Sequence, residues 1–172
     1  MGKEIERKWI GILTEDLREI LKGKDFVEIK DYYFNDYTRL RNIDGKWFIT
    51  VKSLGNDVRE EFEFEIDKSQ VDFIPSSILV KKRFFHDYKG HKFEINVFRD
   101  IAMLKDEHLA TNLIIVECEL KDKDEEIILP NFLGKEVTFD SSFYGRTLFH
   151  RIKQDYKEPI RGVYELKLEV SD

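Results

Sequence analysis

Alternation of polar and apolar residues with a period of two dominates this chain and constrains its fold more than any other feature. In the first such segment, Lys3–Ile10, the side chains of Glu4, Glu6 and Lys8 share one face of an extended strand. The same alternation recurs in Ile29–Asn35, Tyr37–Ile43, Lys46–Ser53, Val58–Ile66, Ile78–Asp87, Lys92–Arg99 and Asn112–Lys121. The pattern therefore predicts about eight β-strands.

Short connections between these segments favour antiparallel pairing of neighbouring strands. Asp44-Gly45 is a typical two-residue hairpin turn, and the stretch around Gly90 predicts a second one. The clearest helix is expected after Thr14, which can cap it, and before Gly23, which can end it. Weaker patterns predict further elements: helices over KSQVDFI after Asp67, DKDEEII before Pro130 and SSFYGRTLFHRIKQ from a Ser141 or Ser142 cap, and a ninth strand over Val163–Val170.

The composition is that of a folded, soluble protein. Hydrophobic residues make up 41% of the 172, too many for a disordered chain, and one domain over 1–172 is the simplest division. The net charge of −6 argues against generic binding of DNA. A single cysteine excludes a disulfide framework, and no apolar run is long enough to cross a membrane. We therefore expect a single-domain cytoplasmic protein; a homodimer is left open.

Strand register brings charged residues from different strands onto one face. With the two-residue turn described above, Arg39, Arg41 and Lys52 point the same way. A four-residue loop after this hairpin would place Arg59 opposite Lys52. The face then carries seven acids and seven bases: Glu4, Glu6, Glu61, Glu63, Glu94, Glu117 and Glu119, with Lys8, Arg39, Arg41, Lys52, Arg59, Lys81 and Arg83.

Two arrangements could explain such a charged face. An ordinary sheet with one face in water is the simpler explanation for any single strand, but such faces usually mix uncharged polar residues with the charges. Eight antiparallel strands can instead close into a barrel without open edges, with the charges inside. Unpartnered charges there would be costly, so we expect a bound polyanion and Mg²⁺ or Mn²⁺ on the carboxylates. The predicted fold is α+β: a closed antiparallel eight-stranded β-barrel (tunnel) with helices packed outside.

Short charged motifs follow one another along the chain in the order EIERK, TRLR, TVKS, REEFEFEI, KKRF, FEINVF, IVECEL and LGKEVT. In this order they resemble the motifs of the CYTH domain, or triphosphate tunnel metalloenzyme, superfamily, whose signature is Glu-x-Glu-x-Lys. The likeness covers nearly the whole chain and is greatest to bacterial inorganic triphosphatases. It implies a closed eight-stranded barrel and a metal-dependent hydrolase in which a metal-activated water attacks inorganic triphosphate.

The resemblance also implies a role for each charged motif. The catalytic candidates are Glu4, Glu6 and Lys8. The metal-ligand candidates are Glu4, Glu6, Glu63, Glu117 and Glu119. The substrate-binding candidates are Lys8, Arg39, Arg41, Lys52, Arg59, Lys81, Arg83 and Arg146. The implied cofactor is Mg²⁺ or Mn²⁺, and the implied partner is a small polyanion: tripolyphosphate, or a nucleoside or thiamine triphosphate.

Two departures from the family pattern bear on this site. Asn96 stands where many relatives carry Asp, so a carboxylate is lost, although the amide oxygen can still act as a weak ligand. Ser142-Phe143 stands where relatives often carry Arg-Tyr, and Arg146 is the nearest basic residue on the expected helix.

The fold does not choose the reaction. We favour triphosphate hydrolysis because the single-domain layout is most similar to the bacterial tripolyphosphatases. A class IV-type adenylate cyclase and a thiamine-triphosphatase are the alternatives with the same fold. A non-catalytic polyphosphate or nucleotide sensor is the alternative of a different class. Such a binder needs the bases but does not need so many carboxylates that can bind a metal.

Overall fold

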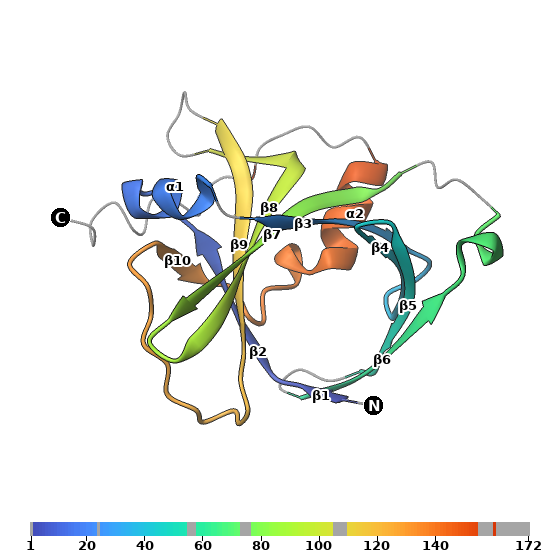
Figure 1. The fold of residues 1–172 in the computed structure, drawn as a ribbon, viewed down its shortest axis with the longest axis horizontal. Helices are drawn as coiled ribbons and strands as arrows, with labels where there is room; N and C mark the ends of the chain where they lie inside the picture. Colours follow the sequence, from blue (N-terminus) through green and yellow to red (C-terminus); the bar gives the residue numbers. More distant parts are fainter. Residues whose placement is uncertain are drawn as a thin grey trace.

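The computed structural model describes residues 2–23, 25–54, 58–72, 77–104, 110–154 and 160. Within these residues ten strands form one antiparallel sheet, in the order β1-β6-β5-β4-β3-β7-β8-β9-β2-β10 (Figure 1). The strands are β1 (Gly2–Glu4), β2 (Glu6–Gly11), β3 (Phe26–Tyr33), β4 (Thr38–Ile43), β5 (Lys46–Lys52), β6 (Arg59–Ile66), β7 (Leu79–Tyr88), β8 (His91–Leu104), β9 (Ala110–Glu119) and β10 (Leu133–Glu136). The helices are α1 (Glu15–Leu21) and α2 (Gly145–Lys153), with two 3₁₀ turns, η1 (Lys68–Gln70) and η2 (Ser141–Phe143).

The prediction of eight strands is wrong, and both additional strands have a local cause. The first predicted strand is divided at Ile5, because Glu4 pairs with β6 whereas Glu6 pairs with β9. The other addition, β10, has four residues, too few to show alternation, and it pairs with β2 beside Trp9 and Gly11. The mostly antiparallel architecture is confirmed.

The sheet curves until its two ends are joined by the N-terminal segment (Figure 1). Strand β1 lies at one end and pairs with β6. After Ile5 the same chain continues as β2, which pairs with β9 and β10 near the other end. The two ends are therefore connected by the backbone and not by a ladder of hydrogen bonds, so a closed barrel is not confirmed.

Both predicted hairpin turns are present, and their backbone explains the strand register. Asp44 and Gly45 have positive φ angles of 46° and 90°, and Lys89 and Gly90 have 48° and 87°. Two successive positive φ angles define the type I′ turn, whose twist matches that of paired strands. The β4–β5 register is the predicted one, and the charged residues of this hairpin share a face.

The predicted register of the next hairpin is wrong by two residues. Lys52 lies opposite Glu61 and not opposite Arg59, because the connection between β5 and β6 is longer than four residues. Arg59 instead pairs with Glu4 on β1. A shift of two residues leaves every side chain on its original face, so all of these residues remain on the charged face.

The first predicted helix is confirmed, and the others need correction. The hydroxyl of Thr14 accepts a hydrogen bond from the backbone N–H of Leu17 and so caps α1. Among its described residues, 68–72, the pattern after Asp67 forms the turn η1 and no helix beyond it, and the acidic stretch before Pro130 is not helical. That stretch has no apolar periodicity that packing could stabilise as a helix.

The C-terminal pattern forms two elements where one was predicted. The carboxylate of Asp140, not Ser141 or Ser142, caps the turn η2, and α2 begins separately at Gly145. The predicted ninth strand over Val163–Val170 lies outside the described residues.

The two helices pack against opposite faces of the sheet. In Figure 1, α1 lies to the left of β9 and α2 to its right. Helix α1 buries Leu17 among Trp9, Phe93 and Val116. These sheet residues alternate with the charged residues, so they belong to the outer face.

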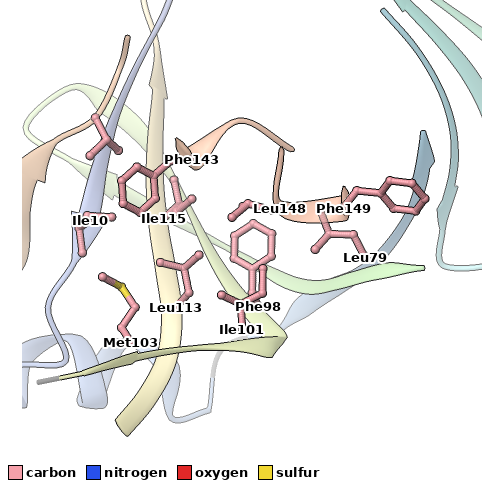
Figure 2. Close-up of a cluster of buried hydrophobic side chains, with 11 residues drawn as sticks. Ile10, Leu79, Phe98, Ile101, Met103, Leu113, Ile115, Phe143, Leu148 and Phe149 are labelled. Carbon is pink, nitrogen blue, oxygen red and sulfur yellow. The ribbon is translucent and has the colours of Figure 1, made fainter. Parts of the chain in front are cut away.

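Helix α2 packs against the inner face, the one that carries the charges. This face changes from charged to apolar along β2 and β9: Lys8 is followed on the same side by Ile10, and Glu117 is preceded by Ile115. Figure 2 shows the apolar half, where side chains of η2 and α2 meet those of the strands. Its residues are Ile10, Leu79, Phe98, Ile101, Met103, Leu113, Ile115, Val137, Phe143, Leu148 and Phe149.

The prediction that the helices lie outside the barrel is therefore correct for α1 and wrong for α2. Alternation shows which residues share a face, but a face that is charged at one end and apolar at the other can still hold a helix at its apolar end. Helix α2 fills that half and leaves the charged half beside it.

This packing makes Leu148 important for stability. Leu148 on α2 is 1% exposed, so Leu148→Ala should lower the free energy of unfolding by about 2–5 kcal/mol through lost burial and a residual cavity. Urea denaturation measures the change. Leu129→Ala, at a position 46% exposed, is the control and should change it by less than about 0.5 kcal/mol. Equal effects at the two positions would contradict α2 as a packed element.

Candidate functional site

A cavity of about 300 Å³ lies on the inner face, between the charged half of the sheet and the η2–α2 segment. Among the described residues, eight acids and eight bases line it. Every residue predicted for the site is among them: Glu4, Glu6, Lys8, Arg39, Arg41, Lys52, Arg59, Glu63, Lys81, Arg83, Glu117, Glu119 and Arg146. The fold thus brings the predicted residues together, whereas their roles as ligands stay predictions.

Carboxylates near the N-terminal strand are paired with cations from the same cavity. The Nζ of Lys52 lies 3.0 Å from Glu4 Oε2 and 3.1 Å from Glu61 Oε2. The Nη2 of Arg59 lies 3.9 Å from Glu4 and 3.8 Å from Glu6. Since each cation contacts two acids, these side chains neutralise one another inside the cavity.

Lys8 and Glu117 form the centre of a second network. The Nζ of Lys8 lies 2.9 Å from Glu6 Oε1 and 3.6 Å from Glu117 Oε1. Burial disfavours the charge on Lys8, but the two carboxylates outweigh it and raise the pKa of Lys8 above its ordinary value. For Glu117 burial is likewise outweighed by nearby cations, of which Lys8 acts most strongly, and its carboxyl pKa falls well below its ordinary value. Both groups are therefore charged at neutral pH.

The carboxyl pKa of Glu119 is shifted in the opposite direction, upward. Burial raises its carboxyl pKa, and the negative charges of Glu4, Glu6 and Glu61 raise it further. Glu6 and Glu119 also lie directly opposite each other on β2 and β9. Like charges at opposed strand positions repel, so this group of acids is under electrostatic strain.

Carboxylates are suitable ligands for a hard divalent cation, but the acids of the cavity are not positioned to coordinate one. Carboxylate oxygens are the ligands that Mg²⁺ and Mn²⁺ prefer, and a cation would relieve the repulsion around Glu119. In the part of the chain that the structure describes, however, no three His, Cys, Asp or Glu side chains are grouped as metal ligands. Binding a metal would require Glu4 and Glu6 to exchange their present lysine and arginine partners.

Asn96 holds the Nε edge of the Arg83 guanidinium. Its amide oxygen accepts a hydrogen bond from Arg83 Nε at 2.8 Å, and its amide nitrogen donates to the Ile115 carbonyl at 3.1 Å. Arg83 also contacts Glu94 at 3.0 Å and Glu117 at 3.4 Å. Asn96 is fully buried, so the structure gives its amide oxygen an arginine as partner where the sequence suggested a weak metal ligand.

Asp31 is a residue of this region that the sequence analysis missed. It lies opposite Arg41 on the neighbouring strand, and the guanidinium donates to it twice, from Nε at 2.7 Å and from Nη2 at 2.8 Å. Burial alone would raise the Asp31 pKa, but Arg41 outweighs it and holds the pKa far below the ordinary value. An acid within an alternating strand gives no sequence signal that separates it from its neighbours.

Lys81 is a buried cation of the cavity whose charge is poorly compensated. It is 7% exposed, and among the described residues no carboxylate lies within ion-pair distance of its Nζ. The contact that the structure does show is the Phe98 ring, 5.6 Å away. Burial lowers the pKa of Lys81, and the charges of Arg83 and Arg41 lower it well below its ordinary value. An anion bound in the cavity would raise the pKa of Lys81 again by stabilising its charged form.

The η2–α2 segment forms the remaining wall. A Cβ at Gly145 would overlap the hydroxyl of Tyr33, so the absence of a side chain there lets Tyr33 reach the helix start. Arg146 stacks over the Tyr144 ring at 4.8 Å, and its Nε is 3.9 Å from Asp36 Oδ1. Arg146 is therefore a partly exposed cation that lines the cavity, and its role toward the substrate stays a prediction.

Acid should weaken the fold through Asp31 and Glu117. Both carboxyl pKa values are lowered by folding, so their contribution is present above the unfolded value of about 4 and is lost as the pH falls toward the folded-state value. We expect the free energy of unfolding, measured with urea, to fall steadily from about pH 5 to pH 2. The free energy of unfolding should fall less with pH for Glu117→Gln. The same dependence on pH as in the wild type would show that Glu117 does not contribute to the acid sensitivity.

Lys81→Met should stabilise the protein while weakening anion binding. Because folding lowers the Lys81 pKa, the unfolded chain binds this proton more readily below about pH 10, and removing the charge favours the folded state. We expect the Tm at pH 7.5 to rise by about 2–4 °C, on the order of 1 kcal/mol. Calorimetric titration should show tripolyphosphate binding about tenfold more weakly.

The matched control is Lys82→Met, which removes the neighbouring exposed lysine of the same strand. It should leave both the Tm and the affinity close to those of the wild type. Unchanged affinity in Lys81→Met would show that Lys81 does not meet the anion.

Comparison with known proteins gives relatives over most of the chain. No family model matches it. An inorganic triphosphatase of Acetivibrio thermocellus is 28% identical over 167 residues, which cover 92% of this chain and 100% of the relative. An inorganic triphosphatase of Nitrosomonas europaea is 32% identical over 117 residues, 64% of this chain and 72% of the relative.

A solved structure agrees with these relatives. The crystal structure of the inorganic triphosphatase NE1496 matches with a TM-score of 0.57 and 26% identity, covering 87% of this chain and 95% of that one. The charged strand motifs, the cavity that they line and these relatives lead to one conclusion: the chain belongs to the CYTH, or triphosphate tunnel metalloenzyme, family and is similar to its bacterial inorganic triphosphatases.

Proposed function

We propose that this protein hydrolyses inorganic triphosphate. The observation that carries the proposal is a cavity lined by eight acids and eight bases, in a chain whose relatives are named inorganic triphosphatases. A triphosphate is a compact polyanion without apolar parts, and a wall of lysines and arginines binds such an ion through charge-assisted hydrogen bonds. A tunnel that closes around the substrate is part of this proposal.

The proposed binding step is an exchange of partners. Glu4, Glu6, Glu63, Glu117 and Glu119 are the candidates for holding Mg²⁺ or Mn²⁺. If Glu4 and Glu6 held such a metal ion, Lys8, Lys52 and Arg59 would lose carboxylate partners that they now contact at 2.9–3.9 Å. These three cations would then become available to phosphate oxygens.

The chain's own residues would promote hydrolysis by position and charge. Arg41 and Arg83 are buried or nearly so and are held by Asp31 and Glu94, so they need little reorganisation when the substrate binds. Their fixed charges hold the polyphosphate in line with an attacking water, which is the main requirement of phosphoryl transfer. A bound divalent cation would neutralise charge on the phosphates and make water more acidic.

We further propose a single domain over 1–172 in the cytoplasm. Among the described residues no helix is long and apolar enough to span a membrane. A homodimer stays a prediction.

One assay panel tests the reaction. Purified protein with Mg²⁺ or Mn²⁺ is given tripolyphosphate, thiamine triphosphate or ATP, and both phosphate and cyclic AMP are measured. We expect the highest kcat/KM for phosphate release from tripolyphosphate, and loss of activity with EDTA. Cyclic AMP as the main product would make the protein a cyclase, and preference for thiamine triphosphate would change the substrate. Tight tripolyphosphate binding without turnover would identify a sensor.

The acid cluster gives a second test. Glu119→Gln should lower kcat at least about 100-fold, because charge stabilisation carries this type of catalysis. It should leave the Tm equal or higher, because the repulsion that raises the Glu119 pKa is relieved. Glu60→Gln removes an exposed acid on β6 and should change neither. A lower Tm with unchanged kcat would make Glu119 a structural residue.

A further inference from the structure

We propose that Asp31 is a positioning residue for the substrate: it fixes the guanidinium of Arg41 so that its remaining donors face the cavity. This inference rests on the proposed function, because it concerns how the same cavity binds tripolyphosphate. Asp31 is 1% exposed and is not among the residues that line the cavity, whereas Arg41 is 5% exposed and does line it. Asp31 therefore acts through Arg41 and does not meet the ligand itself.

The geometry of the pair explains how the guanidinium is held. An arginine has five N–H donors in a rigid planar fork. Asp31 takes the Nε donor at 2.7 Å and one Nη2 donor at 2.8 Å, so three donors remain. Because two parallel hydrogen bonds fix both the position and the plane of the fork, these three donors have a defined direction.

Stability alone is a poor explanation for this pair. A buried ion pair is often no more stabilising than apolar residues of similar volume, since both charges lose their hydration. The neighbouring Ile29 and Leu79 show that the surroundings of Asp31 accept apolar side chains. A guanidinium that is oriented before the ligand arrives would instead bind phosphate with a smaller loss of side-chain entropy.

The neighbouring Arg83 is supported in a comparable way. Asn96 accepts from its Nε at 2.8 Å, and Glu94 contacts its Nη1 at 3.0 Å. Two arginines of the cavity thus have their Nε edges fixed by buried partners. The difference is that a single buried carboxylate accepts both hydrogen bonds from Arg41, so removal of Asp31 changes both the orientation and the net charge near Arg41.

A double-mutant cycle measures this role. Tripolyphosphate affinity is determined by calorimetric titration with EDTA present, so that binding is followed without turnover, for wild type, Asp31→Asn, Arg41→Met and the double variant. We expect Asp31→Asn to weaken binding about tenfold, and to have no further effect once Arg41 is replaced. With metal present, Asp31→Asn should raise KM by a similar factor and change kcat less than threefold.

The matched control is Glu136→Gln on the outer side of the molecule. Arg7 donates to Glu136 from Nε and Nη2, both at 2.8 Å, which is the same two-bond geometry away from the cavity. This variant should leave both affinity and KM unchanged. Should Asp31→Asn fail to fold, Asp31→Glu keeps the charge but displaces the carboxylate, and the same cycle is measured with it.

Additive losses in the cycle, or an Asp31 variant that lowers only the Tm, would overturn the inference and make Asp31 structural. The proposed function fails separately. If the wild type binds tripolyphosphate but does not hydrolyse it, the affinities still decide the role of Asp31. If the wild type does not bind tripolyphosphate at all, both proposals fall.

Discussion

Acids and bases on the inner face of the sheet neutralise one another, and both the curvature of the sheet and the cavity rely on this pairing. These side chains are largely removed from bulk water, and an unpaired charge in such surroundings is costly. Lys52 joins Glu4 of β1 to Glu61 of β6, and Lys8 joins Glu6 of β2 to Glu117 of β9. The backbone connection at Ile5 brings these two networks together, so the charge pairing and the curved sheet support each other.

The change from charged to apolar along the inner face determines where the site lies. Side chains of η2 and α2 pack into the apolar half, and Tyr33 reaches the start of α2 because Gly145 has no side chain. The charged half cannot be filled in this way, since no apolar segment would compensate for the loss of hydration. It remains as a cavity with equal numbers of acids and bases among the described residues, but Lys81 has no carboxylate within ion-pair distance there. Such a cation makes the site receptive to a polyanion.

Much of this could be predicted from the sequence because strand alternation is a local property. Period-two spacing identified most strands, and the Asp44-Gly45 turn set a register that placed Arg39, Arg41 and Lys52 on one face. The cavity collects every residue expected for the site. The short strand β10 and the break at Ile5 were missed, because four residues or a single change of partner leave no periodic signal. Asp31 was missed because alternation cannot show which arginine an acid will contact.

Spacing along the chain is enough to show which residues form strands and which of them share a face. It also shows that this face is rich in both acids and bases. The pairing of individual acids and bases follows from the folded sheet. Lys52 lies opposite Glu61, and Arg59 lies opposite Glu4, because the connection between β5 and β6 is longer than expected. The tertiary structure also decided that α2 lies inside the curve of the sheet. Partner choice and helix placement depend on distances between strands that are remote in sequence, and those distances exist only once the sheet has curved and packed.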